Sequence, residues 1–207
     1  MRKVNLFVED FGHETFLEPL LQRFARQYSV LIETKFVSSR GGYGTVVSEL
    51  RKYMRDLQRG RGHLPDLVIV ATDGNCKGQT ERKRQIDEIT KSFNGPVICA
   101  IPDPHIERWL LLDSAAFKKV LGKGCLAPVQ KCERDLYKRL LITSVRDAGK
   151  EPVLDGIEYA EQLVRVMDLE YLEKVEESLG KFLKDLRRQF QEWQRAEQNA
   201  SHTPSEG

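Results

Sequence analysis

No stretch of this sequence comes near the ~20 consecutive apolar residues that a membrane-spanning helix needs. The N-terminus, MRKVNLFVED, also lacks the apolar stretch and the cleavage site of a secretory signal peptide. These two absences predict a protein that works in the cytoplasm and is not embedded in a membrane.

Cysteine is scarce and irregularly spaced. The four cysteines are Cys76, Cys99, Cys125 and Cys132. None of them forms a CxxC pair, and Cys125 and Cys132 have no histidine near them in the sequence. This spacing indicates neither a zinc site nor a framework of disulfides.

An excess of charge of one sign is missing as well. The 33 lysines and arginines and the 31 aspartates and glutamates leave a net charge of only +2. The field of the whole chain therefore does not identify a nucleic-acid-binding protein, and such a function would depend on local patches.

The residues that are present describe a globular protein. Of its 207 residues, 40% are hydrophobic and 31% charged, which is enough to enclose a core beneath a well-hydrated surface. This length exceeds the ~100 to 150 residues of a typical domain but is short for two domains. We expect one domain with a helical extension.

Short apolar runs alternate with helix-like segments in the first part of the chain. The predicted strands are residues 4–8, 30–39, 66–73 and 96–102. Apolar residues recur at helical spacing after each strand: beyond Gly12, beyond Gly42, over 79–93 and over 105–122. Such alternation is typical of parallel strands joined by crossover helices, so we predict an α/β fold whose parallel sheet of about four strands has helices on both faces.

The pattern changes after residue 122. A helix is expected over about 131–147, and further helical segments reach Glu197. The final residues are polar and are expected to be disordered. We therefore divide the chain into a sheet-containing domain, a helical extension and a tail, over residues 1–122, 123–197 and 198–207.

The last predicted helix is amphipathic. Between Leu172 and Trp193, apolar residues recur mostly at steps of three and four. Its apolar face either packs on the protein's own core or forms a seam with a second copy or another partner.

Acidic residues follow three of the predicted strands. They are Glu9, Asp10 and Glu14 after the first strand, Asp73 with Asn75 after the third, and Asp103 with Glu107 after the fourth. Taken singly, each group is an ordinary turn or helix start. The carboxyl ends of parallel strands meet at one edge, however, and converging carboxylates repel one another unless a cation neutralises them. Oxygen ligands of this kind suit Mg²⁺ or Mn²⁺.

Basic residues gather just beyond the second acidic group. Lys77, Arg82 and Arg84 would hold a nucleic-acid backbone near such a metal. A solvated helix face explains the same run about as well. His13 also has two interpretations, as a proton shuttle or phosphate contact and as a capping or packing residue at a helix start.

Three motifs, in this order and spacing, resemble TOPRIM domains. They are FVEDFGHETFLEPLL, VIVATDGN and AIPDPHIERWLLLD. The sequence is similar in particular to small stand-alone proteins of the DUF4276 and RloB-like kind, relatives of the nuclease domains of overcoming-lysogenization-defect proteins. The resemblance covers roughly residues 1–122.

The resemblance implies a set of metal ligands. In TOPRIM domains a glutamate after the first strand and an Asp-x-Asp after the third bind metal, which corresponds here to Glu9, Asp73 and the position of Asn75. Glu14 and Glu107 correspond to further acidic positions in the nuclease-like members. Asparagine in place of the second aspartate can ligate through its carbonyl but adds no charge.

The function that the resemblance implies is a Mg²⁺-dependent nuclease acting on DNA or RNA. Its catalytic residues would be Glu9, Glu14, Asp73 and Glu107, and its metal ligands Glu9, Glu14, Asp73 and Asn75. Relatives of this kind are often encoded beside an ABC-type ATPase and act in defence against phage, and this chain has no GxxxxGK[ST] sequence of its own. Nucleotidyl transfer at the same site and a catalytically inactive adaptor or sensor are the alternatives.

Overall fold

The computed structural model describes residues 1–38 and 41–201. Its first part alternates strands and helices: β1 (Arg2–Val8), α1 (Phe11–Tyr28), β2 (Ile32–Ser38), α2 (Tyr43–Gln58), β3 (Leu67–Ala71), the 3-10 turn η1 (Asn75–Lys77), α3 (Gly78–Thr90) and β4 (Val97–Ala100). The strands form one sheet in the order β2-β1-β3-β4, and every neighbouring pair is parallel. The predicted α/β fold with a four-stranded parallel sheet is confirmed.

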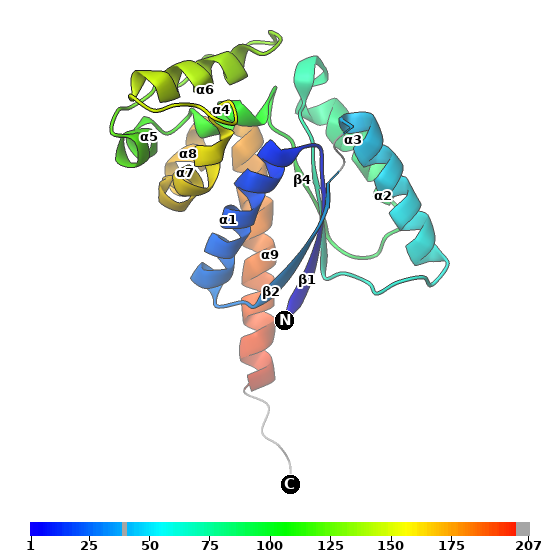
Figure 1. Ribbon diagram of the computed structural model, residues 1–207. Coiled ribbons are helices and arrows are strands. Elements are labelled where there is room, and N and C mark those ends of the chain that lie inside the picture. The colour runs from blue at the N-terminus through cyan, green and yellow to red at the C-terminus, as the bar shows by residue number, and fades with distance from the viewer. Residues whose placement is uncertain (39–40, 202–207) are drawn as a thin grey trace.

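The rest of the described chain consists of helices and the loops between them. The helices are α4 (Ile106–Leu110), α5 (Ser114–Leu121), α6 (Leu136–Asp147), the 3-10 turn η2 (Ile157–Tyr159), α7 (Ala160–Val166), α8 (Leu169–Val175) and α9 (Glu177–Ser201). Figure 1 shows α4 and α6 beside the carboxyl ends of the strands.

Both faces of the sheet carry helices, because side chains alternate in direction along each strand. In β3, Leu67, Ile69 and Ala71 enter one core, whereas Val68 and Val70 enter the other. The first core also contains α1 and the helices from α4 onward, and the second contains α2 and α3. The arrangement of these layers is visible in Figure 1.

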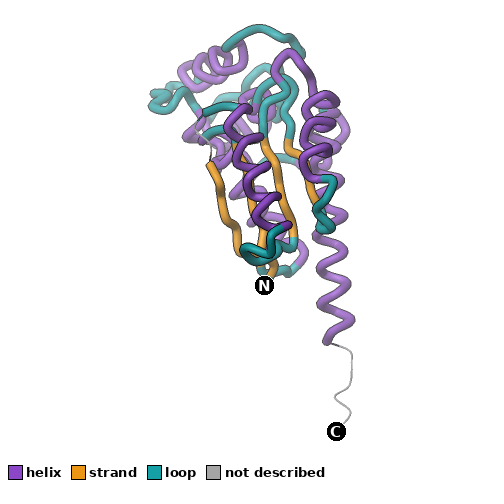
Figure 2. Tube along the Cα trace, turned by 90° about the vertical axis from the view of Figure 1, so that its right-hand side faces the viewer, coloured by secondary structure: helices purple, strands orange, loops and turns teal. Residues whose placement is uncertain are grey.

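The C-terminal helices pack on the first of these cores. Leu179, Phe182, Leu186 and Phe190 of α9 are fully buried in the same cluster as the apolar residues of β1 and α1. The packing of the predicted amphipathic face on the protein's own core is thus confirmed, and a homo-oligomer stays a prediction. Residues 123–197 share a core with the sheet, and α9 extends past the end of the sheet (Figure 2).

Two predicted helices are interrupted in the structure. The segment 105–122 divides into α4 and α5 because Asp113 caps α5, its Oδ1 accepting a hydrogen bond from the Ala116 N–H at 2.9 Å. The C-terminal helix is broken at Glu176, whose backbone is extended and whose carboxylate pairs with the buried Arg108. At the other end of the chain, α1 begins at Phe11, so Gly12 lies inside its first turn instead of in a loop.

The expectation that the cysteines form no disulfide is wrong. Cys76 and Cys132 are bonded, with their Cα atoms 5.4 Å apart. The sequence separates them by 56 residues, and only the fold brings η1 next to the segment that precedes α6. Cys99 and Cys125 are buried free thiols.

The end of the chain differs partly from expectation. Helix α9 runs to Ser201, so residues 198–201, which were assigned to the disordered tail, are helical. The other tail residues, 202–207, lie outside the described residues. Within the described ranges, no helix has the length and apolar character needed to span a membrane.

Candidate functional site

The order of the strands brings two of the acidic groups together. From β1 the chain passes to the outer strand β2 and then crosses to β3, on the other side of β1. In open parallel sheets, ligands bind where the chain reverses direction in this way, at the carboxyl ends of the strands. Glu9 follows β1 and Asp73 follows β3, so these two residues stand at that position.

Glu9 is fixed to the end of the neighbouring strand. Its N–H donates to the Ala71 carbonyl at 3.0 Å, and its carboxylate Oε2 accepts bonds from the Thr72 hydroxyl and from the Asp73 N–H, the latter at 3.0 Å. Oε1 has no hydrogen bond to a described residue, and it faces Gly42, where a Cβ would lie 3.7 Å away. One oxygen of Glu9 is therefore held by the end of β3, and the other has no hydrogen-bond partner within residues 1–38 and 41–201.

Asp73 is surrounded by donors. Its Oδ2 lies 3.0 Å from His105 Nδ1, and its Oδ1 accepts from the Ile106 N–H at 3.0 Å. His13 Nε2 also approaches Oδ1, at 3.3 Å, but without the alignment of a hydrogen bond. Burial alone would raise the pKa of Asp73, but the hydrogen bond from His105 and the nearby charges of His13 and His105 outweigh it and hold this pKa below its usual range.

His13 is a buried cation between two carboxylates. Its Nδ1 lies 2.8 Å from Asp10 Oδ1, and the same oxygen caps α1 by accepting from the His13 N–H at 3.1 Å. Burial lowers the pKa of His13, whereas Asp10 and Asp73 raise it to about 10. His13 is therefore a packed residue at the helix start, where Asp10 supplies the cap, and its role as a proton shuttle or phosphate contact stays a prediction.

Glu107 has the opposite environment. It lies in the first turn of α4, is half-buried, and forms no ion pair with a described residue. Its pKa is raised, first by burial and then by the negative charge of Asp73. A cation that comes close to a carboxylate in this position stabilises its charged form.

Asn75 belongs to the loop that follows Asp73. Its backbone is left-handed, with φ of 49°, and its side-chain amide lies 3.4 Å from the Asp73 carbonyl oxygen. Its N–H donates to Pro104 O at 3.0 Å. A side chain at Gly74 would crowd this loop, because its Cβ would lie 3.0 Å from the Pro102 carbonyl oxygen.

Glu14 lies apart from this cluster. His13 turns inward from α1, and Glu14, one residue further around the helix, lines a separate groove of about 560 Å³ with Glu18, Arg26 and Arg165. The structure therefore places Glu9 and Glu107 each next to Asp73 but does not place Glu14 among them.

The predicted phosphate-binding residues differ in their surroundings. Lys77 is exposed at the end of η1, and the exposed Arg84 is held by Glu81 through bonds of 3.0 and 2.8 Å. Arg82 is only 6% exposed; its guanidinium carbon lies 3.6 Å from the centre of the Tyr43 ring, and its Nε has no hydrogen-bond partner among the described residues. A buried arginine without an acidic partner is costly and attracts an anion.

The sequence did not identify His105, although this residue bonds Asp73 within the cluster. His105 sits between Pro104 and the start of α4, where it bonds Asp73 and is flanked by the charge of Glu107. Its position inside the third acidic motif was the only signal available. The same motif supplies Arg108, which binds the Asp103 carbonyl at 3.3 Å and pairs with Glu176, and so fixes this loop.

The donor set can be tested against a divalent ion. No group of three or more His, Cys, Asp or Glu side chains surrounds a metal position within residues 1–38 and 41–201. Mg²⁺, however, is commonly held by one or two carboxylates, with water and substrate phosphates completing its shell. Oε1 of Glu9 and the carboxylate of Glu107 are carboxylate groups at this edge that form no ion pair with a described residue. Both oxygens of Asp73 already interact with protein donors.

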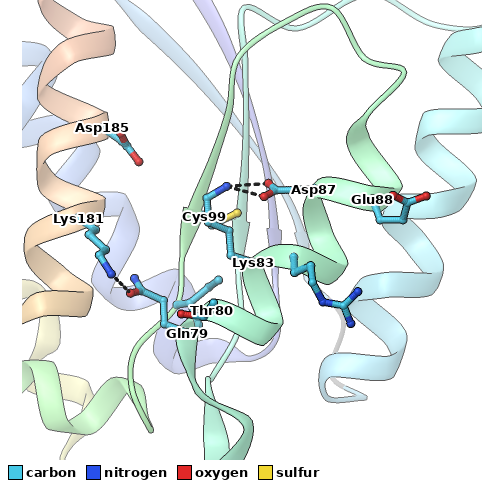
Figure 3. Close-up of a pocket in the computed structure, with 10 residues that line it drawn as sticks. Gln79, Thr80, Lys83, Asp87, Glu88, Cys99, Lys181 and Asp185 are labelled. Carbon is cyan, nitrogen blue, oxygen red and sulfur yellow. Dashed lines mark hydrogen bonds and ion pairs between the residues drawn. The ribbon is translucent and has the colours of Figure 1, made fainter.

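A separate pocket of about 630 Å³ lies between α3, β4 and α9 (Figure 3). Its charged side chains already have partners: Lys83 bonds Asp87 at 2.7 and 2.8 Å, and Lys181 bonds Glu177 at 2.6 Å. The Cys99 thiol lines it and has a pKa raised to about 12 by burial. This pocket shares no residue with the acidic cluster and lacks an unpaired charge that would select a ligand.

Comparison with known proteins identifies the family of this chain. The model of the family described as "Domain of unknown function (DUF4276)" matches residues 8–187. This match confirms the resemblance to DUF4276 and extends it from residue 122 into α9, in keeping with the shared core. No curated protein and no solved structure matches the chain.

Proposed function

The chain belongs to the DUF4276 family, and we propose that it is a Mg²⁺-dependent nuclease that hydrolyses nucleic-acid phosphodiester bonds. The observation that carries this proposal is that Glu9 and Glu107 each lie next to Asp73 at the carboxyl edge of the sheet. Of these residues, Glu107 supports it most directly, because its carboxylate is half-buried beside Asp73 without an ion-pair partner among the described residues.

The ligands of the ion would be the free oxygen of Glu9 and the carboxylate of Glu107. When bound, Mg²⁺ (or Mn²⁺) supplies activation of water and stabilisation of the leaving oxygen. The protein's own residues have other roles. The bonds from Thr72 and Asp73 hold the Glu9 carboxylate in one orientation, and the bond from Ile106 holds Asp73 at the start of α4.

Phosphate groups of the substrate would be held by basic residues next to this edge. Arg82 supports this part of the proposal because its guanidinium is buried against Tyr43 and has no acidic partner among the described residues. Tyr43 directly follows Gly42, which faces Glu9. Lys77 forms no ion pair with a described residue and can contact a nucleic-acid strand. Arg84 would first have to release Glu81.

A TOPRIM ancestry, a partnership with an ABC-type ATPase and a role in defence against phage belong to the same proposal. They rest on the resemblance of the three motifs and not on the geometry. The fold is compatible with them, because TOPRIM domains place their acidic residues on a parallel sheet of this kind.

A second candidate is a catalytically inactive adaptor or sensor. The observation in its favour is that Asp73 already has protein partners on both oxygens, in His105 and Ile106. With Asn75 replacing an aspartate, the histidines can neutralise the cluster without a metal.

The proposal is tested by incubating the protein with plasmid, single-stranded DNA and tRNA, with Mg²⁺, with Mn²⁺ or with a chelator. Glu9→Gln is the informative variant, because it keeps an oxygen acceptor for Asp73 N–H and Thr72 while it removes the charge. Metal-dependent cleavage by the wild type that is lost in Glu9→Gln supports the nuclease. Equal cleavage by both proteins rules out this site as its source.

A further inference from the structure

The disulfide lies at the same edge of the sheet as the acidic cluster. Cys76 belongs to η1, just beyond Asp73, and Cys132 belongs to the segment between α5 and α6, residues 122–135, which we call the strap. Both cysteines are exposed to solvent. Their Cα separation of 5.4 Å is within the ordinary range of disulfides.

The strap has few other attachments. It contains no helix or strand, and its apolar residues Leu126 and Val129 are 90% and 75% exposed. Its first part is anchored by the buried Cys125, whose thiol lies 3.4 Å from the Leu111 carbonyl oxygen. A segment with so little buried surface has low local stability, so its position depends on the few bonds that it makes.

A second attachment connects the strap to the candidate site. The hydroxyl of the buried Tyr137 accepts from the Lys131 N–H at 2.6 Å and lies 3.1 Å from the Val129 carbonyl oxygen. The Tyr137 ring is 6.2 Å from the ring of His105, between centres, and His105 bonds Asp73. The strap is therefore joined to the loop after Asp73 by the disulfide, and it is bonded to Tyr137, whose ring lies near His105.

We propose that Cys76 and Cys132 form a reversible thiol–disulfide site that ties the strap to the loop after Asp73, with a dithiol compound or a dithiol protein as its reaction partner. One thiolate of the dithiol attacks a sulfur of the disulfide, and the other cysteine leaves as a thiolate. The second thiol of the partner then displaces the first cysteine. The partner leaves as a disulfide, and both cysteines take up protons.

Of the four cysteines, Cys76 and Cys132 are the two suited to this exchange. Cys99 and Cys125 are buried, and burial raises the pKa of their thiols to about 12 and about 11. Thiols in this state are poor nucleophiles. In compartments that keep thiols reduced, a disulfide of this exposed kind is typically transient and redox-sensing.

Reduction would release the strap without unfolding the protein. The loop that carries Asn75 keeps its own bonds, from the Gly74 N–H to Pro102 O at 2.7 Å and from the Asn75 N–H to Pro104 O at 3.0 Å. The strap would keep the bonds to Tyr137, the anchor at Cys125, and the bonds of Glu133 and Arg134 to Arg139 of the following helix. We expect it to open on reduction while the core stays intact.

The test compares oxidised protein, protein treated with dithiothreitol, and a Cys76→Ser/Cys132→Ser variant. Alkylation in the native state, mapped by mass spectrometry, should label Cys76 and Cys132 only after reduction and leave Cys99 and Cys125 unlabelled. Limited trypsin digestion should cut after Lys131 and Arg134 several-fold faster in the reduced protein. Cleavage after Arg61, in an exposed turn far from the strap, is the internal control and should not change.

The double variant distinguishes the effect of losing the disulfide from any other effect of dithiothreitol. It should be cut at the rate of the reduced wild type, both with and without dithiothreitol. The proposal is overturned if Cys76 and Cys132 remain free thiols after oxidation. It is also overturned if the oxidised and reduced wild type are cut equally fast, a comparison that does not require the variant to fold. Neither readout depends on nuclease activity.

Discussion

His105 Nδ1 lies 3.0 Å from Asp73 Oδ2, so a histidine of the third acidic motif occupies one oxygen of the aspartate in the second. The hydrogen bond to Asp73 is the largest of the effects that raise the pKa of His105. A positively charged ring at this position would compete with a divalent ion for the same oxygen. If the site binds a metal as proposed, this hydrogen bond should weaken ligation by Asp73.

Replacement of this ring measures the competition. His105→Ala should lower the free energy of unfolding by about 1 kcal/mol, because a hydrogen bond to a charged group at a partly exposed position is lost. It should also strengthen Mn²⁺ binding several-fold, since an oxygen of Asp73 becomes free. Calorimetric titration of Mn²⁺ and urea unfolding give the two values. Unchanged Mn²⁺ affinity would mean that His105 does not compete with the ion.

Arg82 and Arg84 provide a matched pair of basic residues on α3. Arg82→Met should weaken binding of a single-stranded oligonucleotide and lower its salt dependence by about one phosphate contact. Arg84→Met should have a smaller effect, because Glu81 already holds that side chain. Fluorescence anisotropy at several salt concentrations measures both variants.

The stability of the same variants separates a binding role from a structural one. Arg82→Met removes a buried charge that has no acidic partner among the described residues, so stability should stay within about 1 kcal/mol of the wild type or increase. If stability instead falls by more than about 2 kcal/mol while oligonucleotide binding is unchanged, Arg82 is a structural residue.

Phe182 tests whether α9 is an integral part of the domain. Its ring is fully buried and stacks on Trp109, with 6.0 Å between the ring centres. Phe182→Ala should lower the free energy of unfolding by about 3 to 5 kcal/mol, and the protein should still unfold in one transition. Lys184→Ala, at an exposed position of the same helix, should change it by no more than about 0.5 kcal/mol. Two separate transitions would indicate that the extension folds independently.

The strands and their acidic ends were predictable because they depend on local patterns. The four consecutive apolar residues Leu67–Val70 are typical of a strand buried on both faces, and both of its faces do enter a core. The strand order then places Glu9 beside Asp73. The partners of these side chains were not predictable in the same way, because they come from distant parts of the chain.

The features that the sequence did not reveal all depend on tertiary contacts. The bond between Cys76 and Cys132 exists because the strap folds back over the loop after Asp73. The inward direction of His13 and the outward direction of Glu14 follow from their places on α1, which begins at Phe11, whereas the sequence predicted a helix only beyond Gly12. The charge-rich pattern around Arg82 resembled a solvated helix face, although that residue is buried against Tyr43.

Divalent-metal binding by the purified, metal-free protein tests the central claim most directly. Calorimetric titration with Mn²⁺ compares the wild type with Glu9→Gln, Glu107→Gln and Glu14→Gln. We predict that the wild type and Glu14→Gln bind Mn²⁺ alike, and that Glu9→Gln and Glu107→Gln bind it at least tenfold more weakly, a loss of about 1.4 kcal/mol. Absence of binding by the wild type, or equal affinity in all four proteins, would contradict a metal site at this cluster.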